Sequence, residues 1–183
     1  MFTIYVGCVF SSKTSNMIIN ILKYKYHKNI VLFQHGIDDR YDKISTEKIV
    51  THNKHVTFES VRVKDHKELL KLSKKFDIIG IDELQFYSID IVDTIKQLMK
   101  DNKIVIASSL NADYRRKEWK TLSVCIPLAT EIILLKGTCS KCLQNNATCS
   151  YNTCDNGKYQ QIIKSTEKQF IPLCNKCYDE KYE

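Results

Sequence analysis

The sequence predicts an α/β fold, in which helices flank a mainly parallel sheet and a small cysteine-bearing lobe follows. Short apolar runs rich in isoleucine and valine alternate with segments that have the apolar spacing of helices. These runs hold few polar residues, as is typical of strands that are buried on both faces. After Gly137 the alternation ends, and two pairs of cysteines follow. We therefore expect two domains, over residues 1–137 and 138–183.

Each expected element rests on its own pattern. Five apolar runs predict strands, at residues 2–6, 29–33, 77–82, 103–109 and 131–135. Apolar side chains spaced by three and four predict helices at residues 14–26, at 65–76 and from Ser88 or Asp90 to Met99. Asp65 is expected to cap the second of these helices. Residues 35–60 are polar and lack a period, so we expect a long excursion off the sheet there.

The composition is that of an ordinary globular protein. Hydrophobic residues make up 43% of the chain and charged residues 27%, and the longest apolar runs are far too short to span a bilayer. The first residues have the pattern of a strand and not of a signal peptide, so we expect a cytoplasmic protein with no membrane partner. The net charge of +7 suits a phosphorylated ligand as well as nucleic acid. Because the lysines are spread along the chain, a dedicated nucleic-acid-binding arm is not expected.

The eight residues GCVFSSKT, at 7–14, have the pattern of a phosphate-binding loop between a strand and a helix. Such a loop reads G-x-x-x-x-G-K-[ST]; its backbone N–H groups and lysine hold phosphate, and the final hydroxyl binds Mg²⁺. Gly7, Lys13 and Thr14 are in place, whereas Ser12 replaces the second glycine. A serine in the left-handed conformation required there costs about 1–2 kcal/mol, which weakens the loop without forbidding it. A serine-rich turn with no ligand is the alternative interpretation.

An acidic pair, Asp82-Glu83, follows the apolar run at 77–82. A strand that ends in this way delivers a carboxylate to the Mg²⁺ side of a nucleotide site. Glu83 can also accept a proton from an attacking hydroxyl, and Gln85 can hydrogen-bond a base or a substrate. A solvated acidic turn is the alternative. The loop and the acidic pair together, in an α/β chain, favour nucleotide binding and phosphoryl transfer from ATP to an alcohol.

Two C-x-x-C pairs are the most specific local signal in the chain. Four thiolates presented by two such pairs close a tetrahedral structural zinc site with no open position. The four expected ligands are Cys139, Cys142, Cys174 and Cys177. A closed site of this kind does not catalyse; it stabilises a small lobe that lacks a large apolar core.

Taken in order along the chain, these motifs resemble the type II thymidine kinases, which are found in vertebrate cytosol, many bacteria and poxviruses. The resemblance rests on the 7–14 loop, on segments 38–41 and 51–52, on the D-E-x-Q-F pattern at 82–86 and on the two cysteine pairs. It covers nearly the whole chain and implies a P-loop (RecA-like) ATP-binding domain with a zinc-ribbon lobe that carries a lasso loop. The implied enzyme is a homotetramer that transfers the γ-phosphate of ATP, bound with Mg²⁺, to the 5′-hydroxyl of thymidine. Its implied role is the salvage of DNA precursors, with thymidine triphosphate as feedback inhibitor.

The resemblance also implies a role for particular residues. The loop that would bind the ATP phosphates and Mg²⁺ consists of Gly7, Cys8, Val9, Phe10, Ser11, Ser12, Lys13, Thr14 and Ser15. Other residues implied near the phosphates are Asp38, Arg40, Asp82 and Gln85. Glu83 matches the catalytic base of the family. The residues implied around thymidine are Gln85, Leu110, Tyr114, Trp119, Ile163 and Phe170.

The chain departs from the family pattern at several positions. The family writes G-P-M-F-[SA]-G-K-[ST] and D-E-G-Q-F, with a Gly-Gly pair in the lasso. The replacements in this chain are Cys8, Val9, Ser12, Leu84 and Ser165-Thr166. They leave two alternatives to an active thymidine kinase: a relative with altered nucleoside specificity, or a catalytically weak nucleotide-binding protein. A zinc-ribbon protein that binds nucleic acid is a third, but it explains neither Lys13 nor Glu83.

Overall fold

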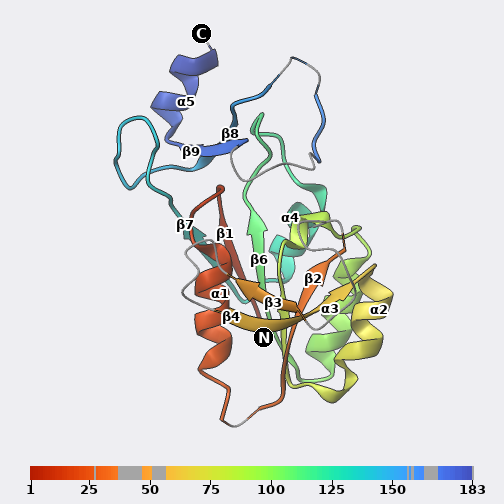
Figure 1. Cartoon of the computed structure of the whole chain (residues 1–183). Helices are drawn as coiled ribbons and strands as arrows, with labels where there is room; N and C mark the ends of the chain where they lie inside the picture. The colour runs from red at the N-terminus through yellow and green to blue at the C-terminus, as the bar shows by residue number, and fades with distance from the viewer. Residues whose placement is uncertain are drawn as a thin grey trace.

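The computed structural model describes residues 1–26, 28–36, 47–50, 57–155, 157, 159–162 and 169–182. Its main body is a seven-stranded sheet with the strand order β3-β4-β2-β5-β6-β1-β7, flanked by helices (Figure 1). Among these strands six are parallel, and β3 at the edge runs antiparallel to its neighbour. The predicted α/β fold class is confirmed.

The five predicted strands and three predicted helices are all present, with ends that differ by a few residues. The strands of the large sheet are β1 (Phe2–Gly7), β2 (Ile30–His35), β3 (Glu47–Val50), β4 (Thr57–Val63), β5 (Ile78–Ile81), β6 (Ile104–Leu110) and β7 (Glu131–Leu135). The α-helices beside it are α1 (Lys13–Leu22), α2 (His66–Leu72), α3 (Ile91–Lys100) and α4 (Lys120–Cys125). The short 3-10 helices are η1 (Ser73–Lys75), η2 (Leu84–Phe86) and η3 (Ile126–Leu128). Asp65 caps α2 as predicted, because its Oδ1 accepts hydrogen bonds from the N–H groups of Lys67 and Glu68, both at 2.9 Å.

The expectation that residues 35–60 leave the sheet is wrong in part. β3 pairs with β4, and β4 pairs with β2, so both strands belong to the sheet. Their sequences, EKIV and TFESVRV, mix charged and apolar residues. Strands near an edge carry such mixtures, and they lack the continuous apolar pattern that identifies a central parallel strand.

Both faces of the sheet are buried. On one face α1 packs Met17, Ile18 and Ile21 against strand residues such as Leu32 and Ile106. On the other face α2, α3 and α4 pack against the intervening residues of the same strands. Because alternate side chains of a strand point to opposite faces, each central strand supplies both cores. The sheet is thereby a rigid base for the loops at its carboxyl end.

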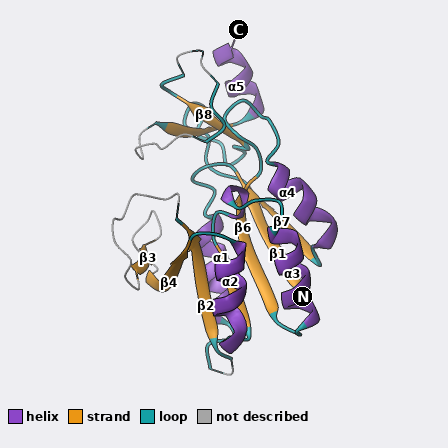
Figure 2. Ribbon diagram, turned by 90° about the vertical axis from the view of Figure 1, so that its right-hand side faces the viewer, coloured by secondary structure: helices purple, strands orange, loops and turns teal. Residues whose placement is uncertain are grey.

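The C-terminal lobe contains β8 (Cys149–Asn152), β9 (Phe170–Leu173) and α5 (Asn175–Tyr182). β8 and β9 form a separate antiparallel sheet. The lobe lies beyond the ends of β1 and β6 (Figure 2). Its small core is made largely of cysteines, together with Cys8 from the 7–14 loop. The division into domains at residue 137 stays a prediction, and the contact through Cys8 shows that the two parts share a core.

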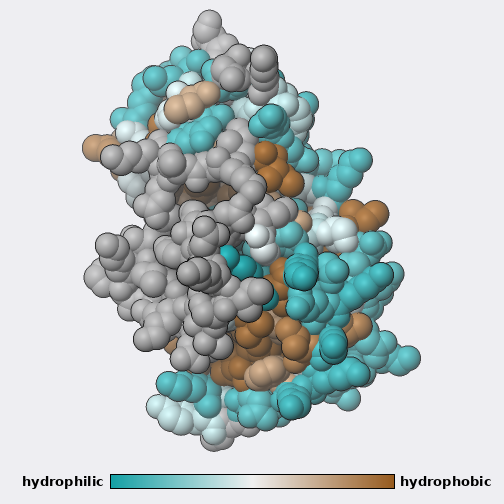
Figure 3. Space-filling model, turned by 45° about the vertical axis from the view of Figure 1, so that its right-hand side comes forward, coloured by the Kyte–Doolittle hydropathy of each residue, from teal (hydrophilic) through white to brown (hydrophobic). Residues whose placement is uncertain are grey.

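On the face shown in Figure 3, hydrophilic residues cover much of the coloured surface and lie beside a hydrophobic area. In the described residues, no helix combines the length and the apolar character needed to cross a membrane.

Candidate active site

The 7–14 loop keeps a left-handed residue at the position of the missing glycine. Ser12, which directly precedes α1, has φ 61° and ψ 28°, and Phe10 also has a positive φ of 56°. For a residue other than glycine this conformation costs about 1–2 kcal/mol. The loop therefore has the backbone shape that glycine favours, and Ser12 holds that shape under strain.

Gly7 is required at the start of this loop. A Cβ atom added there would lie 2.5 Å from the carbonyl oxygen of Leu135 and in collision with the side chain of Ser11. Real Cβ atoms do not approach other atoms so closely, and the obstacle on the β7 side is backbone. The first glycine of the pattern is therefore kept for a steric reason.

Lys13 is folded into the loop instead of extending into solvent. Its Nζ donates a 2.7 Å hydrogen bond to the carbonyl oxygen of Cys8, which also accepts a 2.8 Å bond from Ser11 Oγ. The side chain is only 7% exposed. Burial lowers the pKa of Lys13, and the nearby charge of Glu83 opposes that shift. A phosphate group entering the loop would give this ammonium a stronger, ionic partner.

The acidic pair meets the loop at the carboxyl end of β5. Thr14 Oγ1 donates a 3.0 Å hydrogen bond to Asp82 Oδ1, and Ser108 Oγ donates to the same oxygen. Asp82 is 4% exposed. Burial, and then the charge of Glu83, raise the pKa of Asp82 to about 6, although the two hydroxyl donors lower it. Because burial disfavours the ionised form of this carboxyl group, a cation bound beside it would stabilise the carboxylate.

Glu83 is held by Gln85 and by the end of β6. Gln85 Nε2 donates to Glu83 Oε2, while Gln85 Oε1 accepts from Leu110 N at 3.0 Å and from Ser109 Oγ at 3.1 Å. Glu83 itself has a φ of 52°. Strained residues of this kind gather at functional sites, where the surrounding structure holds them in place. The Gln85 amide, expected to face a base or a substrate, thus also orients Glu83.

The structure explains why Leu84 can stand where the family pattern has glycine. The left-handed residue of this turn is Glu83, whereas Leu84 begins the 3-10 helix η2 and has an ordinary φ. The Leu84 side chain is fully buried in the main core. Position 84 therefore needs no glycine in this chain.

The residues expected around the nucleoside form two neighbouring groups. Tyr114 packs near Phe170, with ring centroids 6.2 Å apart, at the side of the lobe. Trp119 stands edge-on to Phe86 at 5.9 Å. Leu110 is the last residue of β6 and lies beside Gln85. Of the other predicted site residues, Asp38, Arg40 and Ile163 lie outside the described residues.

A cavity of about 450 Å³ opens beside Gln85 and Trp119. Its lining also includes His35, Lys64, Asp65, Phe86, Tyr87, Ser88, Lys120, Thr121, Gln161 and Ile162. Burial lowers the pKa of His35, which disfavours the charged imidazolium. Two polar atoms of lining residues, Tyr87 Oη and Trp119 Nε1, are buried without a hydrogen-bond partner in the described part of the chain. The cavity combines aromatic walls with polar groups, as small-molecule sites do.

The segment that carries Tyr114 and Trp119 is bound to the lobe. Tyr159 Oη donates a 2.6 Å hydrogen bond to Asp113 Oδ2, and Arg115 forms a bidentate ion pair with Asp155 at 3.0 Å. The lobe is therefore positioned by contacts next to the candidate nucleoside walls.

The sequence alone missed the serines at the end of β6. Ser108 and Ser109 are fully buried and hold Asp82 and Gln85. Their signal is two adjacent hydroxyl residues closing an otherwise aliphatic strand, IVIASSL. A buried hydroxyl needs a partner, so such a pair at a carboxyl strand end indicates a polar site.

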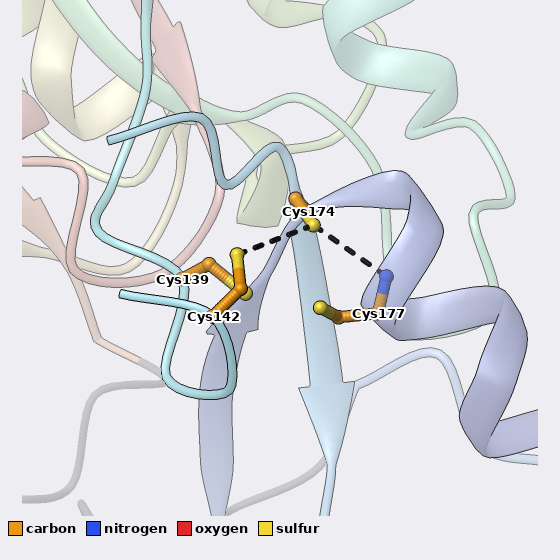
Figure 4. Close-up of side chains that lie close together, drawn as sticks. All are labelled: Cys139, Cys142, Cys174 and Cys177. Atoms are coloured by element: carbon orange, nitrogen blue, oxygen red, sulfur yellow. Dashed lines mark hydrogen bonds between the residues drawn. The ribbon is translucent and has the colours of Figure 1, made fainter. Parts of the chain in front are cut away.

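The four predicted cysteines lie together and fit a metal ion. Their sulfur atoms all lie within 4.8 Å of one another, with Cys139 and Cys142 on one loop and Cys174 and Cys177 at the start of α5 (Figure 4). The sulfur atoms of Cys142 and Cys174 are 3.9 Å apart. Four sulfurs at 2.3 Å from one tetrahedral zinc are separated by about 3.8 Å. Burial raises the pKa of Cys139, but hydrogen bonds from backbone N–H groups, foremost that of Cys142, lower it by more. The net result is a pKa of about 6.

The α/β fold and the sheet edge where the 7–14 loop meets Asp82 form a candidate nucleotide site. A sequence model of the family described as thymidine kinase matches residues 1–178. The chain belongs to the thymidine kinase family and is a thymidine kinase enzyme. The thymidine kinase of Choristoneura fumiferana entomopoxvirus is 31% identical over 183 residues, covering 97% of this chain and 95% of that one. That of Bacteroides thetaiotaomicron is 28% identical over 173 residues, covering 94% and 83%, and that of Pyrobaculum aerophilum is 31% identical over 146 residues, covering 78% and 77%.

Proposed function

We propose that this protein transfers the γ-phosphate of ATP to the 5′-hydroxyl of thymidine, giving ADP and thymidine monophosphate for DNA synthesis. The observation that carries the proposal is the hydrogen bond between Thr14 and Asp82. It joins the 7–14 loop to the acidic pair at one edge of the sheet, beside Lys13 and Glu83. Phosphoryl transfer needs these parts together, since its catalysis is mainly positioning and electrostatic stabilisation.

In this proposal the 7–14 loop binds the phosphates of ATP. The N-terminus of α1 and the loop N–H groups favour an anion. When phosphate is bound, Lys13 Nζ gives up its hydrogen bond to the Cys8 carbonyl and donates to phosphate oxygens instead. Thr14 and Asp82 offer oxygen ligands of the kind that Mg²⁺ prefers. When bound, Mg²⁺ neutralises the charge that develops on the phosphates. We place Asp38 and Arg40 near the same phosphates.

Glu83 is the proposed catalytic base. It accepts the proton of the 5′-hydroxyl as that oxygen forms its bond to the γ-phosphorus and ADP leaves. The hydrogen bond from Gln85 fixes one carboxylate oxygen and leaves the other available. Leu110, Tyr114, Trp119, Ile163 and Phe170 are the proposed walls around thymidine.

The four cysteines are the proposed ligands of a structural zinc ion in a lobe at 138–183, with the ATP-binding domain at 1–137. As in the family pattern, we also propose a cytoplasmic homotetramer that thymidine triphosphate inhibits. These statements rest on the family to which the chain belongs and on the fit of the four thiols.

The test is transfer of labelled γ-phosphate from ATP to thymidine, deoxycytidine, deoxyuridine and deoxyguanosine, with zinc-replete protein and Mg²⁺. Thymidine is expected to be the preferred acceptor. Lys13→Ala should lose the transfer, whereas Lys25→Ala, which changes an exposed lysine beyond the end of α1, should keep it. Transfer only to another nucleoside would show altered specificity.

The strained Ser12 favours one second candidate, a nucleotide-binding protein with weak catalysis. No transfer to any of the four nucleosides by folded, metal-loaded protein would support it. Thymidine triphosphate is expected to raise the melting temperature of an intact site, because a ligand that binds only the folded state stabilises it. A raised melting temperature without transfer would point to this second candidate.

A further inference from the structure

The metal lobe touches the 7–14 loop through two hydrogen bonds. The N–H of Val9 donates to Ser150 Oγ at 3.1 Å, and Cys8 Sγ donates to the carbonyl oxygen of Ala147 at 3.3 Å. The partners in each pair are 141 and 139 residues apart in the sequence. The middle of the loop is therefore held from the lobe as well as by Ser11 and Lys13, whose side chains donate to the carbonyl oxygen of Cys8.

This contact is buried and close. Cys8 is inaccessible to solvent and Ser150 is 5% exposed. A Cβ atom added at Gly137 would lie 3.4 Å from the carbonyl oxygen of Phe10, so the chain entering the lobe passes directly beside the loop. An N–H group at such a place is costly to leave without a partner, and Ser150 supplies that partner to Val9.

The same serine is tied to the cysteine cluster. It lies on β8 opposite Pro172 of β9, and β9 ends directly before Cys174. The core around it contains Cys139, Cys174 and Cys177 as well as Cys8. Small lobes of this kind owe much of their stability to their metal, so loss of the ion would loosen β8 and with it the hydroxyl that holds Val9.

The loop depends on a fixed backbone to bind phosphate. Val9 directly precedes the three-residue stretch from Phe10 to Ser12, whose first and last residues both have positive φ. Backbone N–H groups bind an anion only while such a stretch keeps its shape, and here the shape is strained. The hydrogen bond from Val9 N–H to Ser150 Oγ therefore affects the affinity of the loop for phosphate, although Ser150 lies outside the loop.

We propose that Ser150 is a positioning residue for the 7–14 loop, through which zinc binding in the lobe and ATP binding at the loop strengthen each other. The inference rests on the proposed function, because it takes the loop as the site of the ATP phosphates. Coupling between two binding sites is reciprocal. If zinc improves the affinity for ATP, bound ATP must hold zinc more tightly by the same factor.

The test measures the zinc affinity of the full-length protein by equilibrium competition with a colorimetric chelator, with and without saturating ATP and Mg²⁺. ATP is expected to lower the dissociation constant of zinc about fivefold, the effect of one ordinary hydrogen bond. In Ser150→Ala, ATP should change the dissociation constant of zinc by less than twofold, and the dissociation constant of ATP should rise about fivefold. Ser140→Ala, at an exposed serine of the same lobe, should behave as the wild type. Lys13→Ala at the same ATP concentration corrects for any zinc that ATP itself removes.

The outcomes separate this inference from the proposed function. Failure of ATP to bind the wild type, measured by calorimetry, would overturn the proposed function. Binding of ATP without tighter zinc binding would overturn the coupling and leave the kinase proposal standing. If Ser150→Ala does not hold one zinc per chain, the dissociation constant of ATP is measured for wild-type protein before and after zinc removal; equal values overturn the coupling.

Discussion

Thr14 and Asp82, 68 residues apart, share a 3.0 Å hydrogen bond at the carboxyl end of the central strands. The bond is possible because β1 and β5 are parallel to β6 and flank it, so their following residues emerge at the same edge. Ser108, at the end of β6 between them, donates to the same carboxylate oxygen. The arrangement follows from strand order and gives the chain a polar site at an otherwise aliphatic sheet edge.

Replacement of Ser12 by glycine should stabilise the protein. Glycine adopts the φ of 61° without the steric penalty of serine, and the gain in free energy of unfolding should be about 1 kcal/mol. Chemical denaturation of both proteins measures it. Asn102→Gly is a matched control, since Asn102 also has a positive φ, of 56°, but asparagine tolerates that conformation better. A Ser12→Gly protein no more stable than wild type would show that the loop is not strained.

Replacement of Glu83 by glutamine should abolish turnover and leave ATP binding nearly unchanged. The amide keeps the shape of the side chain but cannot accept the proton of the attacking hydroxyl, so we expect a loss of about 10²–10⁴-fold in kcat. Single-turnover transfer and a separate measurement of ATP affinity distinguish the two effects. Glu131→Gln, at an exposed position on β7, is the control. Substantial remaining turnover would remove Glu83 from the role of base.

The pKa of Asp82 gives the variant Asp82→Asn a pH-dependent effect on stability. In the folded protein this pKa is raised to about 6, above its value in the unfolded chain. A raised carboxyl pKa favours the folded state at low pH, and that advantage is lost as the pH rises from about 4 towards 6. The asparagine side chain does not ionise. The free energy of unfolding of Asp82→Asn, relative to wild type, should therefore increase by about 1 kcal/mol between pH 5 and pH 7.

Thermal or urea unfolding at both pH values, in the presence of EDTA, measures that difference. Comparing the two proteins cancels the titration of other groups. Asp90→Asn, at the exposed start of α3, should show no such trend. A constant difference between wild type and Asp82→Asn would mean that the Asp82 pKa is not raised.

The sequence predicted the features that depend on neighbouring residues. The central strands carry continuous apolar runs, and each C-x-x-C pair brings its two thiols together within one turn. The left-handed conformation of Ser12 also followed from the loop pattern, because the missing glycine marks a position that needs positive φ. β3, at the edge, and β4, next to it, were missed because strands near an edge share the mixed composition of loops.

The contacts that complete the site could not be read in this way. Ser108 meets Asp82 only because β6 lies next to β5, and Ser150 meets Val9 only because the lobe folds back over the loop. Such contacts join residues 26 to 141 positions apart, and no local pattern specifies their pairing. Neither Ser108 nor Ser150 was predicted as a site residue, although both are buried and each hydrogen-bonds a residue of the candidate site.

Removal of the metal should unfold the lobe and spare the large sheet. The lobe core is small and includes three of the ligand cysteines, Cys139, Cys174 and Cys177, whereas the sheet has two extensive aliphatic cores of its own. Without an ion, the strands β8 and β9 lose the cross-link that joins both cysteine pairs. Hydrogen exchange should therefore show lost protection at 149–152 and 170–177, with protection retained in β1, β5 and β6.

Cys142→Ser should reproduce this pattern in zinc-containing buffer, and Cys154→Ser, at an exposed cysteine outside the cluster, should not. Full protection of the lobe after verified loss of the metal would show that the cysteine core is stable by itself, and that the ion serves some purpose other than folding.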